Sequence, residues 1–116
     1  MDDQQLRAVL DAERARAEQR LAAARADFDR IVAAGELVAT DDEHDPEGIG
    51  LAMERAHVSA AVESALQRLE QLDAAQTRLT SDDFGRCTVC GRPIPIERLL
   101  IRPTALTCVG CAPSTR

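Results

Sequence analysis

All four cysteines of the chain lie near its C-terminal end, in two pairs that each enclose two residues. The pairs are Cys87 with Cys90 and Cys108 with Cys111, and 17 residues separate them. Each pair can place two sulfurs on one side of a metal ion through a tight turn, and two such turns complete the tetrahedron that Zn²⁺ prefers. Four thiolates leave no open coordination position for a reacting water. The spacing therefore predicts one structural Zn²⁺ held by all four cysteines.

Two other uses of the cysteines compete with a zinc site. A pair of disulfides would need an oxidising compartment, and the N-terminal residues 1–5 have neither the basic segment nor the apolar run of a secretory signal. A redox-active dithiol usually opens a helix in a strand–helix–strand unit, a periodicity that the sequence lacks. Zinc accounts best for the spacing, and Gly91 and Gly110 would give the turns backbone freedom where φ is often positive.

The composition argues against a conventional globular core. The chain has 116 residues, and its only aromatic residues are Phe28 and Phe84. The 45% hydrophobic content is dominated by alanine and leucine, which favour helices that pack through narrow seams. No apolar run approaches the length of a membrane span, so we expect a soluble, cytoplasmic protein without a membrane partner.

Apolar residues repeat with a helical period in two long segments. In each segment, nine positions advance by alternating steps of four and three residues, and seven of the nine are apolar. The positions are 10, 14, 17, 21, 24, 28, 31, 35 and 38, and then 51, 55, 58, 62, 65, 69, 72, 76 and 79. Such heptad seams predict two long amphipathic helices. The period stops at residues 40–48, where Asp45, Pro46 and Glu47 form a helix-start signal.

If the chain folds back at residue 44 or 45, residues whose numbers add up to 89 or 90 become partners across an antiparallel pair. The polar exceptions of the two seams then meet, because Arg14 faces Gln76 and Gly35 faces Arg55. We therefore predict a mainly α fold. A long antiparallel helical hairpin, or coiled coil, occupies residues 1–80 with an acidic tip at 40–48, and a small four-cysteine zinc-finger module with short β-like ribbons occupies 81–116. Zinc would fasten the bases of two helices that bury little area alone.

The charge of the chain is unevenly distributed. Residues 1–83 carry 9 arginines against 19 acids, whereas residues 84–116 carry 5 arginines against Glu97 alone. Affinity for a phosphate backbone comes from a concentrated basic surface. We therefore expect no direct sequence-specific binding of nucleic acid.

The segment around the cysteines resembles a known family. Phe84-Gly-Arg-Cys-x-x-Cys-Gly-x-x-Ile94, Arg98-Leu99, Arg102-Pro-Thr-Ala105 and the last cysteine pair look like the zinc finger of the DksA/TraR family, and the preceding hairpin looks like its coiled coil. The resemblance implies a transcription regulator that enters the secondary channel of bacterial RNA polymerase with its tip near the active centre. It also implies a changed lifetime of promoter complexes, often together with guanosine tetraphosphate.

The family's tip motif, D-x-x-D-x-A, can be matched to Asp42 and Asp45, with Glu47 where alanine is expected. The resemblance thus implies that Asp42, Asp45 and Glu47 contact the polymerase, and the alternative is a solvated turn whose acids cap a helix. The chain contains no lysine, which leaves few cations, Arg68 among them, for alarmone phosphates. A response to guanosine tetraphosphate is therefore not expected.

Two further functions remain open from the sequence. The chain can be a zinc-stapled coiled-coil adaptor for another protein, or a thiol-based redox or zinc sensor. An enzyme is not expected, because the sequence offers no open metal position, no pairing of a nucleophile with a base and no phosphate-binding loop.

Overall fold

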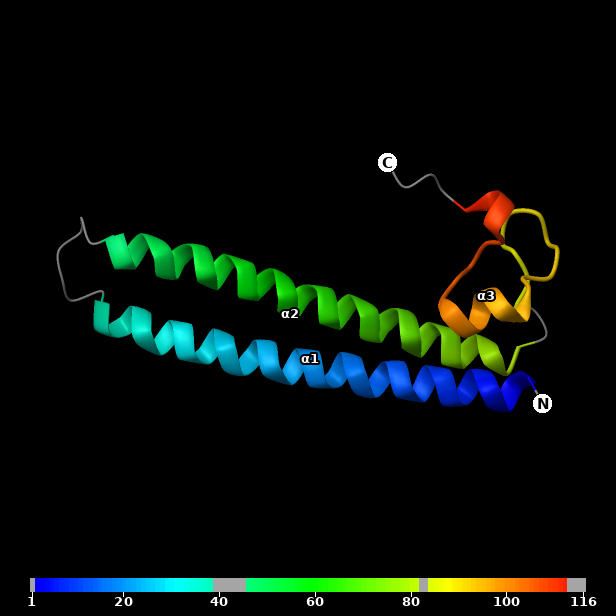
Figure 1. Cartoon of the computed structure of the whole chain (residues 1–116), viewed down its shortest axis with the longest axis horizontal. Coiled ribbons are helices and arrows are strands. Elements are labelled where there is room, and N and C mark those ends of the chain that lie inside the picture. Colours follow the sequence, from blue (N-terminus) through cyan, green and yellow to red (C-terminus); the bar gives the residue numbers. More distant parts are fainter. Residues whose placement is uncertain (1, 39–45, 82–83, 113–116) are drawn as a thin grey trace. The chain divides into compact units, whose positions relative to one another are not determined.

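The computed structural model describes residues 2–38, 46–81 and 84–112, without the side chains of residues 2, 37–38 and 46–48. Three α-helices and one 3₁₀ turn make up this part of the chain (Figure 1). They are α1 (Asp2–Val38), α2 (Pro46–Leu79), α3 (Ile96–Ile101) and η1 (Val109–Cys111). The extended residues contribute an isolated antiparallel bridge between Arg86 and Pro93. The predicted fold class, a long helical hairpin followed by a four-cysteine module, is confirmed.

The ends of α2 follow from its sequence. The helix begins at Pro46, as the helix-start signal predicted, because a proline ring has the φ that the first helical position needs and its missing N–H would be unpaired there. It ends at Leu79, the last position of the predicted seam. The predicted tip residues Asp42 and Asp45 lie outside the described residues.

The chain divides into two compact units. The cysteine unit consists of Met1–Ala15 and Leu69–Arg116, and the hairpin unit consists of Arg16–Arg68. In each unit a stretch of α1 runs antiparallel to a stretch of α2 (Figure 1). The sequence predicted a domain boundary between residues 80 and 81, with the hairpin before it and the zinc-finger module after it. This boundary stays a prediction.

The seam of the cysteine unit is buried. Leu10 and Leu72 are both 1% exposed, and Leu79 and Leu6 are buried with them. Removing a leucine side chain from water contributes about 1.5–3 kcal/mol, so these residues are the main source of stability where the helices meet. Three of them occupy predicted seam positions, and Leu6 extends the seam by one turn.

The polar residues of this seam find partners on the opposite helix. Arg14 forms an ion pair with Asp73, and the Gln76 side-chain amide donates a hydrogen bond to Asp11 Oδ1 at 2.9 Å. In both contacts the residue numbers add up to 87, so the register differs here by two or three residues from the predicted one. Arg14 and Gln76 thus each meet a carboxylate one helical turn before the residue that we expected them to face.

The seam of the hairpin unit becomes less covered toward the turn between the helices. Its buried residues are three alanines and one leucine, and all lie near the middle of the helices: Ala17, Leu21, Ala24 and Ala65. None of the described side chains in residues 25–36 and 49–64 is buried, and the seam residues Phe28, Ile31 and Val58 are only half-buried. Two helices without a third layer leave one side of their seam open to solvent.

No helix in the described part of the chain combines the length and the apolar character that crossing a membrane would require.

Candidate metal centre

The four cysteine sulfurs converge in the cysteine unit. All four Sγ atoms lie within 4.8 Å of one another, and Cys90 Sγ is 3.9 Å from Cys108 Sγ. Tetrahedral Zn²⁺ with Zn–S bonds of about 2.3 Å holds its sulfurs roughly 3.8 Å apart. Four soft thiolates in this arrangement are the donor set that zinc prefers over harder cations. The cluster could therefore bind one zinc ion.

The first cysteine pair forms a tight turn around the sulfur of Cys87. The backbone N–H groups of Val89 and Cys90 both point to Cys87 Sγ, at 3.4 and 3.5 Å. The N–H of Gly91 donates to the Cys87 carbonyl oxygen at 2.9 Å, and Gly91 itself has φ 74°. Glycine closes the turn at this position because a side chain is strained at that φ.

The second cysteine pair uses a different turn. The N–H of Cys111 donates to the carbonyl oxygen of Cys108 at 3.1 Å within η1. The positive φ values of the described glycines belong to Gly85 and Gly91. The predicted need for a special backbone conformation therefore holds for Gly91 and is wrong for Gly110, because a 3₁₀ turn uses helical φ values that any residue adopts.

Two hydrogen bonds join the segments that carry the cysteine pairs. The N–H of Thr88 in the first turn donates to the Leu106 carbonyl oxygen at 2.9 Å. Arg98 Nε in α3 donates to the Thr107 carbonyl oxygen, also at 2.9 Å, directly before Cys108. These bonds hold the two turns against each other independently of a metal.

Helix α3 was not predicted from the sequence, which indicated short β-like ribbons in this module. Pro95 precedes it and ends the extended stretch, so the ribbon is reduced to the bridge between Arg86 and Pro93. Leu99 is the buried residue of this helix, whereas Ile101 at its end is 81% exposed. A six-residue helix has too few turns to produce a recognisable apolar period.

The surroundings of Cys87 and Cys111 shift the pKa values of these two thiols in opposite directions. Hydrogen bonds from the backbone N–H groups of Cys90, Cys108 and Val89 stabilise the thiolate of Cys87 and lower its pKa to about 6, against the opposing effect of burial. The pKa of Cys111 is raised to about 12, because its thiol is hydrogen-bonded to Cys108 and Cys87 and is partly removed from water. Without a metal, one sulfur of the cluster is thus prepared as a thiolate near neutral pH.

The sulfurs also differ in their access to solvent. Cys87 is buried at 3% exposure, Cys108 and Cys111 are half-buried, and Cys90 is exposed. A metal ion in the cluster would be reached most easily past Cys90.

The predicted acidic tip cannot be placed in the same way. Asp42 and Asp45 lie outside the described residues, and so does the side chain of Glu47, although its backbone belongs to the first turn of α2. Their predicted contact with a partner stays a prediction.

The chain thus combines a long helical hairpin with a four-cysteine cluster of the kind found in zinc fingers. Within the chain, residues 82–114 match the model of the prokaryotic dksA/traR C4-type zinc finger. This segment is therefore a zinc finger of the dksA/traR type, and the resemblance seen in the sequence is confirmed.

Two known proteins extend the comparison. The curated RNA polymerase-binding transcription factor DksA of Haemophilus influenzae is 44% identical over 43 residues, which are 37% of this chain and 30% of that protein. The match thus spans less than a third of the relative's length. The structure of transcription factor DksA2 from Pseudomonas aeruginosa covers 89% of this chain and 79% of its own, with a TM-score of 0.53 and 24% identity. At this identity the second match supports the fold alone.

Proposed function

We propose that the chain is a cytoplasmic, non-enzymatic transcription regulator that binds bacterial RNA polymerase through its secondary channel, with the turn between α1 and α2 near the active centre. The observation that carries the proposal is the dksA/traR zinc finger at residues 82–114, which follows a helical hairpin with the fold of transcription factor DksA2. The Haemophilus influenzae relative of this zinc finger is described as polymerase-binding. A response to guanosine tetraphosphate is not part of the proposal.

The proposed role of zinc is structural. Cys87, Cys90, Cys108 and Cys111 are the proposed ligands, and the convergence of their sulfurs supports this assignment. A bound ion would link residues 84–91 to residues 106–112 within the cysteine unit and would leave no open position for catalysis.

The proposed contacts at the active centre are the carboxylates of Asp42, Asp45 and Glu47. In the low-dielectric interior of a protein complex, a carboxylate acts strongly on nearby cations or metal ions. The charge of the chain supports this role, since the turn places five acids within the seven residues 41–47.

The test of this role is transcription by purified polymerase with the double variant Asp42→Asn and Asp45→Asn. The proposal expects the variant to bind polymerase and to lose its effect on transcription. A control variant, Asp29→Asn with Glu36→Gln, also removes two charges, but from the exposed surface of α1, and should act like the unmodified chain. An unchanged effect of the tip variant at retained binding would show that the acids only cap a helix.

A second candidate function, thiol-based sensing, is favoured by the exposure of Cys90 beside the low-pKa sulfur of Cys87. Two cysteine thiolates can reduce hydrogen peroxide to two water molecules, with two protons from the solvent, while a disulfide forms between the two sulfurs. Zinc would then be lost, because a disulfide is a poor ligand. Release of zinc at low peroxide doses, measured with a chromogenic chelator, would favour the sensor. Slow release would exclude it.

A further inference from the structure

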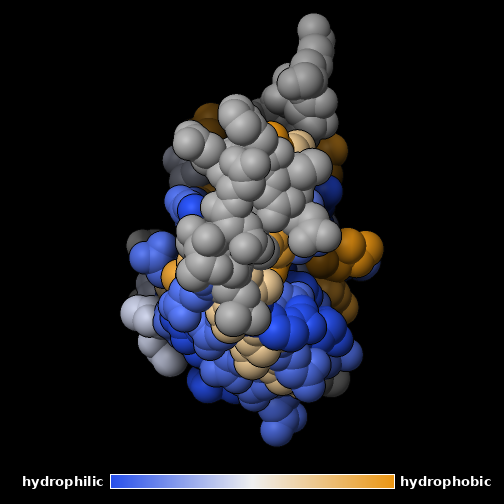
Figure 2. Space-filling view, turned by 90° about the vertical axis from the view of Figure 1, so that its left-hand side faces the viewer, coloured by the Kyte–Doolittle hydropathy of each residue, from blue (hydrophilic) through white to orange (hydrophobic). Residues whose placement is uncertain are grey.

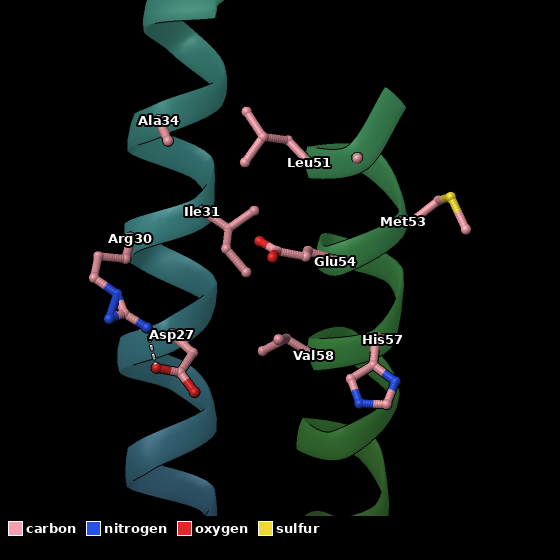
Figure 3. Close-up of a pocket in the computed structure, with 10 residues that line it drawn as sticks. Asp27, Arg30, Ile31, Ala34, Leu51, Met53, Glu54, His57 and Val58 are labelled. Carbon is pink, nitrogen blue, oxygen red and sulfur yellow. Dashed lines mark hydrogen bonds and ion pairs between the residues drawn. The ribbon is translucent and has the colours of Figure 1, made fainter. Parts of the chain in front are cut away.

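An open groove lies between α1 and α2 in the hairpin unit. Its volume is about 810 Å³, and four half-buried apolar residues form its floor: Ile31, Ala34, Leu51 and Val58. In Figure 3, Ile31, Leu51 and Val58 point into the space between the two helices. Met53, at the edge of the groove, is 69% exposed, and Ile49 nearby is 66% exposed. The groove is the part of the seam that two helices leave uncovered.

One carboxylate lies within this apolar groove. Glu54 extends from α2 toward Ile31 of α1 (Figure 3). The other charged residues that line the groove, Asp27 and Arg30, form an ion pair with each other. Within the described residues, no hydrogen bond or ion pair joins Glu54 to another side chain. The groove thus offers aliphatic contacts around the Glu54 carboxylate, with the ion pair of Asp27 and Arg30 and the imidazole of His57 also in its lining.

The shape and charge of the groove restrict what can cover it. A furrow between two antiparallel helices accepts a third helix, whose side chains at positions i, i+3, i+4 and i+7 reach the floor. The segment 16–68 carries 6 arginines against 11 acids, which disfavours an anionic membrane, a nucleic acid or a second copy of the same segment. Figure 2 shows hydrophobic residues beside strongly hydrophilic ones on the face of the molecule that it draws. An amphipathic helix with a cation in its apolar face matches both the shape of the groove and its negative charge.

We propose that this groove binds an amphipathic helix of the polymerase that places a lysine or arginine against Glu54 and aliphatic side chains on Ile31, Leu51 and Val58. The inference rests on the proposed function, because the polymerase supplies the helix. It adds a docking surface on the flank of the hairpin to the contacts proposed for the acidic tip. Burying Glu54 without a partner would cost free energy, so the cation determines which helix fits.

Affinity for purified core polymerase tests the charge requirement. Glu54→Arg should weaken binding by roughly tenfold or more, because the two cations then repel each other at close range. Glu63→Arg is the matched control, since it lies nine residues later on α2 and therefore half a turn around the helix, away from the groove. Both positions are exposed, so neither variant should unfold the chain, and circular dichroism verifies this.

Photocrosslinking tests the location. A benzoylphenylalanine at Met53, on the edge of the groove, should crosslink to a helical polymerase segment that contains a lysine or arginine between aliphatic residues. The same probe at Ser59, which is exposed and lies about 120° around α2 from Met53 and about 140° from Glu54, should give little of that product. Both results together support the inference.

Two failures can be told apart. If the chain binds polymerase while Glu54→Arg binds equally well and Met53 gives no helical crosslink, the groove inference is overturned and the proposed function stands. If the unmodified chain does not bind polymerase, the proposed function and the inference both fall. A dimer of the chain that Glu54→Arg disrupts, without any effect on polymerase binding, would also overturn the inference, because the occupant is then a second copy.

Discussion

At the scale of single residues, the backbone N–H groups around a cysteine sulfur determine how readily its thiol ionises. The N–H groups of Val89 and Cys90 both point to Cys87, so this sulfur is stabilised as a thiolate before any metal arrives. The cysteine spacing predicted that the sulfurs converge, because the distance between the ligands of a pair is nearly fixed by two intervening residues. The difference between the pKa values of Cys87 and Cys111 could not be predicted from the sequence, since it depends on the hydrogen bonds that each sulfur makes in the fold.

This difference predicts how many protons zinc displaces. The lowered pKa of Cys87, about 6, means that its thiol is protonated at pH 5 and largely ionised at pH 7.5. Zinc should therefore release about one proton fewer at pH 7.5 than at pH 5, because the Cys87 ligand is already ionised at the higher pH. Calorimetry in buffers of different ionisation enthalpy measures the number. Equal release at both pH values would contradict the arrangement around Cys87.

The linked effect on stability has a definite sign. In the metal-free protein, a thiol whose pKa falls on folding stabilises the fold at pH above its unfolded pKa, and this contribution disappears as the pH falls through about 6. The raised pKa of Cys111 acts in the opposite sense, because it destabilises the fold as the pH rises from about 9 toward 12. Metal-free protein should thus lose stability toward both ends of this range.

The two glycines next to the cysteines offer a matched pair of substitutions. An added Cβ would meet no atom within 4 Å at either Gly91 or Gly110, but only Gly91 has a positive φ. Gly91→Ala should therefore destabilise the zinc-loaded fold by about 1–2 kcal/mol, the cost of a left-handed residue, whereas Gly110→Ala should be nearly neutral. Urea unfolding of both variants checks this. Equal effects would mean that the turn at Gly91 differs from the one described.

At the scale of helices, the heptad pattern predicted which face of each helix is apolar but not how well that face is covered. The start of α2 at Pro46 and its end at Leu79 followed from local signals. The openness of the seam around Ile31 and Val58 did not, because periodicity is the same whether or not a third layer is present. The register at Arg14 was not predicted either, because its partner Asp73 lies outside the seam.

The uneven burial of α2 predicts uneven sensitivity to truncation. Leu72 is 1% exposed and Leu66 is 40% exposed on the same helix. Leu72→Ala should reduce the free energy of unfolding by about 2–5 kcal/mol, because it removes a buried side chain and leaves a cavity. Leu66→Ala should cost less than about 1 kcal/mol, since surface substitutions have small effects. Similar losses for both variants, measured by denaturant unfolding, would show that the seam runs elsewhere on α2.

At the scale of the whole molecule, the metal site and the helix bases belong to one compact unit. Residues 1–15 and 69–116 form this unit, so the buried leucines Leu10 and Leu72 and the four cysteines contribute to the same folded body. Segments this small often depend on a metal for stability. The hairpin unit, with its open seam, has no such support of its own among the described residues.

Removal of zinc should therefore affect the helices and not only the zinc finger. Chelation should lower the midpoint of thermal unfolding of the chain by at least roughly 10 °C, because a structural zinc ion contributes several kcal/mol to folding. Circular dichroism at the helical signal measures the midpoint, and added zinc should restore it. An unchanged midpoint after verified loss of the metal would show that the helices pack independently of the site.

The most direct measurement is the binding of the zinc-loaded chain to purified core RNA polymerase, with and without a ligand that occupies the secondary channel. We predict a saturable complex that the channel ligand displaces. The contrary result is a chain that carries zinc and keeps its helical signal in circular dichroism but does not bind polymerase, or binds equally well in the presence of the channel ligand. This result would contradict the proposed function.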